Sequence, residues 1–270
     1  MAAVRAACLD GDGADPLDEA AQLRLKHHGL DATHRLWIVD EHGFALVREA
    51  TLDLVVAPGA RGRGLGGRLA AAVLTGAPVA TAWSHGDHPA AAALAERHGF
   101  ARVRELWVMR RPATTPLPTL EIPADLTIRG YRPDDAAAVL AVNAAAFAHH
   151  PEQGGMDDAD LAARMAEPWF DPAGLLLAVD GDGALLGFHW TKRHSPDLGE
   201  VYVVAISPSA QGRGLGRLLT LAGLHHLAEA GVREILLYVE SDNLPARAVY
   251  ERLGFTHAPA DTHVMYARAT

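Results

Sequence analysis

Two glycine-rich segments with nearly the same sequence are the residues of this chain best suited to bind an anion. The later one reads QGRGLG over residues 211–216, and the earlier one reads RGRGLG over residues 61–66. Glycines leave the backbone amides unobstructed, and the helix expected to follow adds a partial positive charge at its N-terminus. This combination is typical of sites that hold a phosphate or pyrophosphate. A flexible glycine turn would explain one copy alone, but the repetition favours an anion site.

Two other phosphate-binding motifs fit these segments less well. A Walker loop requires Lys-Ser/Thr after its last glycine, whereas the two segments continue with Arg68 and Arg217. The earlier segment does satisfy the dinucleotide spacing GxGxxG, but the later one has Arg217 in the last position. In addition, a proline-containing stretch separates each preceding strand from its first glycine, and a dinucleotide-binding turn is tight.

The elements around the two segments repeat as well. Each is preceded by an apolar, β-branched stretch that predicts a strand, Thr51–Val56 in one copy and Glu200–Ile206 in the other. Pro58 and Pro208 end these strands because proline cannot donate to a continuing ladder. A further pair of matching segments, 91–100 and 246–255, keeps the order of elements. The sequence therefore predicts an α/β fold (an α+β mixed sheet) made of two copies of one unit.

The boundary between the copies is predicted at a proline-rich stretch. Residues 112–123 contain four of the chain's prolines, which disfavour a helix and favour an extended connection. We therefore expect a first domain over 1–111, a linker over 112–123 and a second domain over 124–270. The first helix is expected at 18–28, the last strand of the first domain at 106–111, and the last strand of the chain at 263–268.

Composition excludes several classes of function. The chain has 270 residues and a net charge of −9, which argues against a nucleic-acid surface. Its single cysteine, Cys8, excludes an internal disulfide and fits a reducing compartment. No apolar run approaches the length of about 20 residues that a membrane span needs. The 15 histidines lack metal-ligand spacing. We expect a cytoplasmic protein without a metal, and neither a membrane nor a nucleic acid as partner.

Both glycine segments resemble the pyrophosphate loop Q/R-x-x-G-x-G/A of the GNAT superfamily of acetyltransferases. The resemblance implies two tandem GNAT folds that use acetyl-coenzyme A as co-substrate. In this family the loop holds the pyrophosphate, and the preceding strand pairs with the pantetheine arm. The residues carried over as cofactor-binding are Leu54, Val55, Val56, Gly62, Arg63, Gly64, Leu65, Gly66 and Gly67 in the first copy, and Val204, Ala205, Ile206, Gln211, Gly212, Arg213, Gly214, Leu215, Gly216 and Arg217 in the second.

The resemblance also implies which copy is catalytic. The stretch from Asn243 to Tyr250 is similar to the late helix of GNAT enzymes, where the asparagine, with Ala246 and Arg247, meets the cofactor and the tyrosine is the general acid. Glu200 begins the strand where family general bases often lie. The first copy has Ala50, His88 and Ala95 where the second has Glu200, Asn243 and Tyr250. We therefore expect the first copy to be non-catalytic, although its loop is suited to coenzyme A.

Longer phrases in the second half resemble mycothiol synthases, which are tandem GNAT enzymes. These phrases are HPEQGGM (150–156), GFHWTK (187–192), LGEVYVV (198–204) and LYVESDN (237–243). The resemblance implies acetylation of the cysteinyl amine of a cysteinyl-glucosaminyl-inositol. The substrate contacts that it implies are Glu19, Glu152, Lys192, Glu200 and Tyr238, with Asp18 as an alternative to Glu19. The stretch 193–199 is short for this family, so the resemblance does not assign the substrate loop.

Two other interpretations remain open at this stage. The chain could be a GNAT enzyme that acetylates another small-molecule or peptide amine, or a non-catalytic coenzyme A-binding protein. Glu200 and Tyr250 argue against the second. The expected partner is thus a small-molecule amine, and the expected oligomeric state is a monomer.

Overall fold

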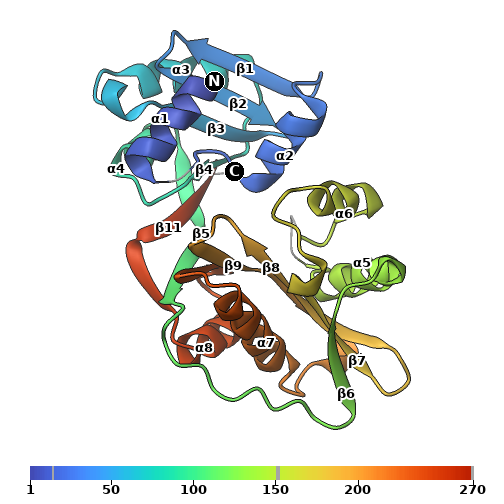
Figure 1. The fold of residues 1–270 in the computed structure, drawn as a ribbon. Coiled ribbons are helices and arrows are strands. Elements are labelled where there is room, and N and C mark those ends of the chain that lie inside the picture. Colours follow the sequence, from blue (N-terminus) through green and yellow to red (C-terminus); the bar gives the residue numbers. More distant parts are fainter. Residues whose placement is uncertain (14, 150–152, 269–270) are drawn as a thin grey trace. The chain divides into compact units, whose positions relative to one another are not determined.

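The computed structural model describes residues 1–13, 15–149 and 153–268. Its internal contacts divide the chain into two compact units, each of which has helices and strands (Figure 1). The first unit comprises Met1–Trp107, Glu240–Asp242 and Ala258–Thr270. The second comprises Val108–Val239 and Asn243–His257. The last strand of the chain is therefore counted with the first unit.

The first unit combines four helices and a mixed set of strands within its described residues. The hydrogen-bonded order of its strands is β1-β2-β3-β4-β11-β5. Antiparallel pairs join β1, β2 and β3, whereas β3 and β4 are parallel. The elements are α1 (Ala2–Asp12), α2 (Glu19–His28), β1 (His34–Val39), β2 (Gly43–Arg48), β3 (Thr51–Val56), α3 (Leu65–Gly76), β4 (Thr81–Ser84), α4 (Pro89–Arg97), β5 (Phe100–Pro112) and β11 (Thr256–Arg268).

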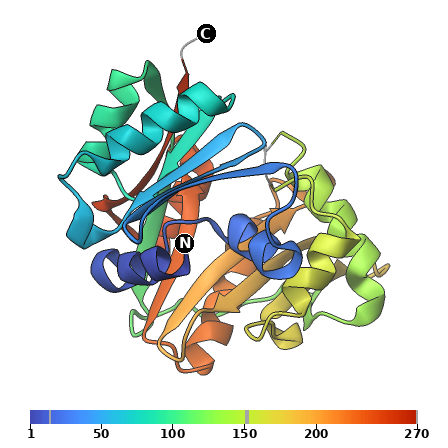
Figure 2. The ribbon, with the colours of Figure 1, turned by 90° about the horizontal axis from the view of Figure 1, so that it is seen from above.

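Side chains that alternate along the strands build two apolar layers in the first unit. Leu46 and Val55 pack with Val4 of α1 and Ala21 of α2 on one face. The other face carries a second cluster, in which Val73 of α3 is fully buried. Figure 2 shows the two helix pairs on opposite sides of the strands, with α1 and α2 in dark blue and α3 and α4 in teal. This alternation is the expected result of the two-residue period of a strand.

The second unit has the same order of elements after its own first strand. Its strand order is β5-β10-β9-β8-β7-β6. The β9–β10 pair is parallel, and the β6–β7, β7–β8 and β8–β9 pairs are antiparallel. The elements are β6 (Leu126–Gly130), α5 (Ala136–Ala146), α6 (Asp158–Met165), β7 (Leu175–Asp180), β8 (Leu185–Arg193), β9 (Leu198–Ile206), α7 (Leu215–Glu229), β10 (Glu234–Glu240) and α8 (Leu244–Arg252).

Strand β8 shows how the second unit separates its two faces. Phe188 and Trp190 pack in the cluster that α5 covers. Between them, His189 lies on the α7 side, where its Nδ1 is 2.8 Å from the carbonyl oxygen of Leu219. Figure 1 shows α5 and α7 flanking the strands of this unit. Burial lowers the pKa of His189 to about 4, so the imidazole is neutral at physiological pH.

The structure adds elements that the sequence patterns did not predict. Helix α1 precedes the expected first helix, and its buried residues Val4 and Cys8 are one turn apart. Strands β5 and β11 are both longer than expected and reach 13 residues each. The division of contacts counts the end of β11 with the first unit, whereas the sequence places it in the second domain. The boundaries 1–111, 112–123 and 124–270 stay a prediction.

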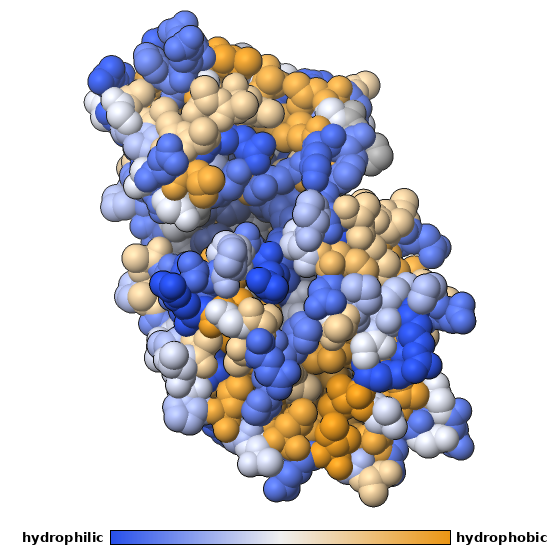
Figure 3. Space-filling view, in the orientation of Figure 1, coloured by the Kyte–Doolittle hydropathy of each residue, from blue (hydrophilic) through white to orange (hydrophobic). Residues whose placement is uncertain are grey.

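The molecular surface is mixed in character. On the face shown in Figure 3, hydrophobic side chains lie in groups separated by hydrophilic ones. Exposed large apolar residues such as Ile38 and Leu244 come from separate elements. Within the described ranges, no helix is both long enough and apolar enough to cross a bilayer.

Candidate active site

The glycine loop of the second unit presents open backbone amides at the start of α7. A short 3-10 helix, Pro208–Ala210, leads into the loop, and Gly212 and Gly214 adopt positive φ angles of 79° and 76°. A Cβ added at either glycine would meet no heavy atom of the described chain within 4 Å. Gly214 is the N-cap of α7 and offers no side-chain cap, so the first amides of the helix remain available to an anion.

The loop of the first unit has the same conformation. Gly62 and Gly64 have φ angles of 76° and 77°, and Gly64 is the N-cap of α3. A 3-10 helix at Pro58–Ala60 precedes them, as in the second unit. The amide of Arg68 donates to the carbonyl of Gly64 over 3.1 Å, which matches the 3.1 Å bond from Leu218 to Gly214. Both predicted loops therefore have the backbone geometry of an anion site.

The strands beside each loop separate after a short parallel ladder. In the second unit the pairing of β9 with β10 ends at Val201 and Leu237, although both strands continue. In the first unit the pairing of β3 with β4 ends at Leu52 and Ala82. The residues predicted to pair with the cofactor, 204–206 and 54–56, lie beyond these points. Their free edges could hydrogen-bond an extended ligand, as an added strand does.

Several loop residues have further contacts. Arg213 forms an exposed ion pair of 3.1 Å with Asp125, and Arg63 donates to the carbonyl of Gly59 over 2.9 Å. Gln211 is exposed in the loop, and Gly216 lies in the first turn of α7. Arg217 lines a hollow together with Pro118, Thr119, Glu121, Leu218 and Leu221. Leu65 and Leu215 open their helices at matching positions.

Glu200 and Lys192 lie side by side on the α5 and α6 side of the second unit. They are direct partners in the antiparallel register of β8 and β9, so their side chains are on the same face. Glu200 is only 4% exposed and Lys192 8%. The register shifts next to this pair, between Trp190 and Thr191, and leaves Tyr202 as the extra residue of β9. Such a bulge redirects a side chain, and here it brings Tyr202 toward Lys192.

Aromatic side chains hold the ammonium group of Lys192. Its Nζ lies 4.9 Å from the ring centre of Trp169 and 5.1 Å from that of Tyr202. The two rings are 5.2 Å apart in an edge-to-face arrangement. The guanidinium of Arg164 donates to the hydroxyl oxygen of Tyr202 over 3.1 Å, which fixes the tyrosine from α6. Cation–π contacts of this kind orient an ammonium without neutralising it.

His194 is a site residue that sequence reasoning missed. Its Nε2 is 2.6 Å from Oε2 of Glu200, and its side chain is 34% exposed. The sequence contains fifteen histidines without a metal pattern, and most of them were interpreted as surface or packing residues. A signal was present, because a short turn between the two strands places His194 opposite Leu198, two residues before Glu200 on β9. Trp169 and Tyr202 were missed as well, because their contact with Lys192 lies beside a β-bulge that the sequence does not predict.

The predicted general acid and its neighbours lie on and before α8. Tyr250 is half-buried, with its ring 6.0 Å from that of Phe255. Burial raises the pKa of Tyr250 to about 12, so the phenol is protonated at neutral pH. Asn243 caps α8 by accepting from the amide of Ala246 over 3.2 Å, and Arg247 pairs with Glu251 at 3.8 Å one turn later.

Two other predicted substrate contacts differ in how much the structure describes of them. Tyr238 is the first residue of β10 beyond the parallel ladder and is 43% exposed. Glu152 lies outside the described residues.

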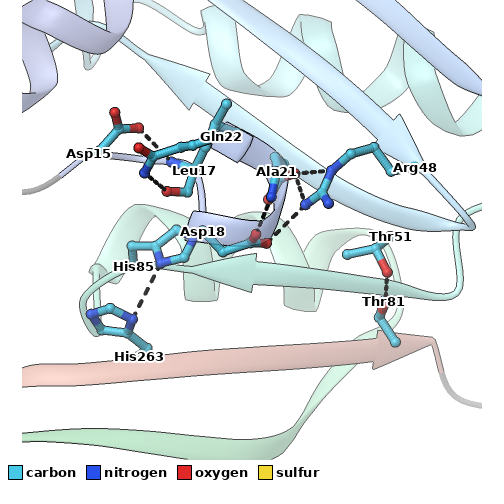
Figure 4. A network of polar contacts seen from close by, with 11 residues as sticks. Asp15, Leu17, Asp18, Ala21, Gln22, Arg48, Thr51, Thr81, His85 and His263 are labelled. Carbon is cyan, nitrogen blue, oxygen red and sulfur yellow. Dashed lines mark hydrogen bonds and ion pairs between the residues drawn. The ribbon is translucent and has the colours of Figure 1, made fainter. Parts of the chain in front are cut away.

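In the first unit, Asp18 and Glu19 have different roles. Asp18 caps α2 by accepting from the amide of Ala21 over 2.6 Å and also pairs with Arg48 at 2.9 Å (Figure 4). Glu19 is the first residue of α2 and is partly exposed. The carboxylate of Asp18 is thus engaged by the helix and by Arg48, and the choice between Glu19 and Asp18 as a substrate contact stays a prediction.

The first unit has a different set of side chains where its strands separate. Asp53, the first residue of β3 beyond the ladder, is 1% exposed and pairs with Arg48 at 2.9 Å. Burial raises the pKa of Asp53 to about 6. Nearby, His85 and His263 contact each other with their Nδ1 atoms 3.3 Å apart (Figure 4). Burial lowers the pKa of His85.

Helix α4 of the first unit begins with a side-chain cap, as α8 of the second unit does. His88 caps α4 by accepting from the amide of Ala90 over 3.2 Å, the role that Asn243 has for α8. Ala50 and Ala95 provide no acid or base at the positions of Glu200 and Tyr250. Across the part of the chain that the structure describes, no group of three or more His, Cys, Asp or Glu side chains could hold a metal ion.

A glycine loop before a helix, beside parallel strands that separate, defines the class of the GNAT acetyltransferases. The model of the Acetyltransferase (GNAT) family matches residues 142–255. A GCN5-related N-acetyltransferase from Sphaerobacter thermophilus superposes with a TM-score of 0.70 at 25% identity, covering 98% of this chain and 90% of that one. A tandem GNAT protein from the clavulanic acid biosynthesis pathway shares the fold, with a TM-score of 0.66 and 20% identity over 97% and 91% of the chains. The predicted tandem GNAT fold is confirmed.

The chain belongs to the mycothiol acetyltransferase family. A mycothiol acetyltransferase from a Nocardioides species is 60% identical, over 99% of this chain and 96% of the relative. Another from Thermobispora bispora is 49% identical, over 98% and 94%. The resemblance that the phrases of the second half predicted is therefore confirmed and extends to the first half.

Proposed function

We propose that this protein transfers the acetyl group of acetyl-coenzyme A to the cysteinyl amine of a cysteinyl-glucosaminyl-inositol and so forms mycothiol. The observation that carries the proposal is the 60% identity, over nearly the full length, to a protein named mycothiol acetyltransferase. A match over both halves of the chain supports the whole activity rather than the fold of one unit. The buried carboxylate of Glu200 and the protonated phenol of Tyr250 give the proposal its chemistry.

In the proposed reaction the second unit binds the co-substrate. The open amides of residues 211–216 receive the pyrophosphate, and the free edge of β9 at 204–206 receives the pantetheine arm. Asn243, Ala246 and Arg247 at the start of α8 complete this site. The thioester then lies where β9 and β10 separate, beside the face that carries Glu200. Backbone amides near Val204 polarise its carbonyl oxygen.

Proton transfer requires a base and an acid with different properties. The acceptor ammonium has an ordinary pKa of about 7.7–8.0 and must lose a proton before its nitrogen can attack. Glu200 accepts this proton, directly or through a water molecule, and the nitrogen forms a bond to the thioester carbon. The carbon–sulfur bond breaks as the intermediate collapses. Tyr250 hydrogen-bonds or protonates the departing sulfur, and the second proton released by the nitrogen as the amide forms completes the thiol or restores the phenol.

Substrate recognition is assigned to charged and aromatic side chains. Lys192 is suited to sugar or inositol hydroxyls or to a carbonyl, since its ammonium is a hydrogen-bond donor oriented by the rings of Trp169 and Tyr202. Tyr238 offers an exposed hydroxyl. Glu19 and Glu152 are proposed as further contacts on the resemblance alone.

We further propose that the first unit binds coenzyme A without catalysing transfer. Its loop has the same backbone angles as the catalytic loop, but Ala50 and Ala95 replace the base and the acid. Equilibrium binding with native mass spectrometry measures this directly, since two coenzyme A molecules per chain are expected. One molecule per chain, lost in Gly214→Val and kept in Gly64→Val, would contradict the proposal for the first unit.

The proposed function is tested by incubating the protein with acetyl-coenzyme A and the cysteinyl-glucosaminyl-inositol. Mass spectrometry should show one added acetyl group that resists hydroxylamine, because an amide resists it and a thioester on the cysteinyl thiol does not. A panel of other amines runs in parallel. Preference for another amine would indicate a different acetyltransferase, and coenzyme A binding without transfer to any amine would indicate a non-catalytic protein.

A further inference from the structure

We propose that His194 is a positioning residue that orients the carboxylate of Glu200 toward the acceptor amine; this inference rests on the proposed function. Nε2 of His194 lies 2.6 Å from Oε2 of Glu200. The carboxylate side chain is 5% exposed and the imidazole 34%. A distance this short is typical of a hydrogen bond in which at least one partner is charged.

The backbone delivers His194 to this place on a closely tied hairpin. The amide of His194 donates to the carbonyl of Leu198 over 2.9 Å. Oγ of Ser195 accepts from the amides of Asp197 and Leu198 over 3.2 and 3.1 Å. The carbonyl of Asp197 in turn accepts from the amide of Arg233 over 2.8 Å. The short turn between β8 and β9 therefore holds the backbone of His194 beside Glu200. This is the stretch that the sequence analysis found short for the family.

The residues beside Glu200 on the two neighbouring strands make contacts different from that of His194. Lys192 is opposite Glu200 on β8, but its Nζ is over the rings of Trp169 and Tyr202. On β10 the residue opposite Glu200 is the apolar Leu236. Of the described residues, His194 is the hydrogen-bond partner found for the Glu200 carboxylate. A glutamate has three side-chain torsions, so a single strong contact decides which oxygen faces the substrate.

The pairing has a direct chemical consequence. With Nε2–H donating to Oε2, the other carboxylate oxygen, Oε1, is left to face the acceptor amine. The acceptor ammonium gives one proton to Oε1, and its nitrogen keeps the electron pair for attack on the thioester carbon. The second proton of the attacking nitrogen passes to the departing sulfur, and the proton on Oε1 passes to water. The products are therefore the amide, the thiol and one released proton.

A solvent-exposed ion pair would have no such role, because pairs of that kind contribute little. The His194–Glu200 pair differs because one member is buried. Removing the imidazole leaves a buried carboxylate without its partner, and hydrogen bonds to charged groups are the stronger class. The loss therefore acts on the reacting group rather than on the surface.

The test compares His194→Ala, His194→Gln and Ser195→Ala in the full chain. His194→Ala should lower kcat about 10–100-fold, the scale of a hydrogen bond to a charged group, and leave KM for acetyl-coenzyme A unchanged. His194→Gln should retain more activity, because the glutamine amide can occupy the place of Nε2 and donate to Glu200. Added imidazole should restore part of the activity of His194→Ala. Ser195→Ala removes only the side-chain acceptor of the turn and keeps both the backbone bond from His194 to Leu198 and the His194–Glu200 pair, so it should resemble the wild type.

The outcomes separate this inference from the proposed function. The assay uses the cysteinyl-glucosaminyl-inositol and a panel of other amines. If the wild type transfers acetyl only to another amine, the proposed substrate is wrong. The His194 variants are then compared with that amine as acceptor. An absence of transfer to any amine overturns both. A His194→Ala variant with wild-type kcat, a Ser195→Ala variant with the same loss, or a failure of both glutamine and imidazole to restore activity overturns the role of His194.

Discussion

The two glycine loops are nearly identical in backbone, whereas the side chains beside them differ completely. The four glycine φ angles lie between 76° and 79°, and each loop follows a 3-10 helix and caps a helix with a glycine. The second unit has the buried Glu200 bonded to His194, a lysine over two aromatic rings and the half-buried Tyr250, whereas the first unit has the buried Asp53 paired with Arg48. The comparison teaches that a few glycines and prolines maintain the fold of such a site, and a few other side chains decide its chemistry.

The largest expected effect is on Glu200. Glu200→Gln keeps the size of the side chain but removes its basicity, and general acid–base catalysis contributes about 10²–10⁴-fold. We expect kcat to fall on that scale, with KM for acetyl-coenzyme A unchanged, in steady-state assays. The matched control is Glu49→Gln, an exposed carboxylate next to the corresponding position of the first unit. Equal losses in both variants would remove the contrast between the units.

The next largest effect is expected from the loops. Gly214→Val forces a β-branched residue into φ 76°, which costs about 1–2 kcal/mol, and it also obstructs the open amides. We expect KM for acetyl-coenzyme A to rise about 10–100-fold, since 1.4 kcal/mol corresponds to tenfold. Gly64→Val imposes the same strain in the first unit and should leave kcat largely intact. Circular dichroism of both variants controls for misfolding. Loss of transfer in a folded Gly64→Val protein, with Gly214→Val active, would assign the chemistry to the wrong unit.

A smaller effect is expected from Tyr250. Burial raises its pKa to about 12, whereas a thiol has an ordinary pKa of about 8.5. Full proton transfer from this phenol to a thiolate is therefore uphill, and a hydrogen bond to the leaving sulfur is the more economical role. We expect Tyr250→Phe to lower kcat about tenfold, at or below the usual range for an acid catalyst. Ala95→Tyr at the corresponding position should create no activity in a Glu200→Gln background. Full activity of Tyr250→Phe would assign departure of the sulfur to another donor.

The last expected effects concern the stability of each unit against pH rather than catalysis. His189 of the second unit has its pKa lowered to about 4, so between about 6.5 and 4 the unfolded chain binds a proton that the folded unit does not. Stability is therefore lost as pH falls through this window, by about 3 kcal/mol at 1.36 kcal/mol per pH unit. His189→Asn, which can still donate to the carbonyl of Leu219, should flatten this dependence in denaturant unfolding.

Asp53 of the first unit should respond in the opposite sense. Its pKa is raised to about 6, so the folded unit binds a proton that the unfolded chain lacks between about 3.8 and 6. Its contribution therefore weakens the first unit as pH rises through that window. The difference between the wild type and Asp53→Asn isolates this contribution from that of His85. Hydrogen exchange of β3 and β8 amides reports each unit separately, and parallel responses of the two strands would contradict the assignment.

Local patterns in the sequence were sufficient for the loops and most strands. Proline positions, glycine spacing and β-branched runs act over a few residues, so the conformations at Gly62 and Gly212 followed from them. Helix α1 was missed because most of its apolar residues are alanines, which give a weak helical periodicity, and only Val4 and Cys8 of the helix are buried. The site around Glu200 could be predicted only in part. The contacts of Lys192 with Trp169 and of His194 with Glu200 depend on a strand register and a bulge, which no local pattern specifies.

The final strand of the chain has a consequence for biosynthesis. Residues 264–267 of β11 pair with residues 81–84 of β4, about 180 residues earlier in the chain. At a synthesis rate of about 5–20 residues per second, β4 leaves the ribosome roughly 10–40 s before its partner exists. Until then the edge of β4 is exposed to pairing with other chains. The first half therefore cannot complete its own sheet during translation, and a message truncated shortly before codon 258 would yield a nascent chain prone to aggregation.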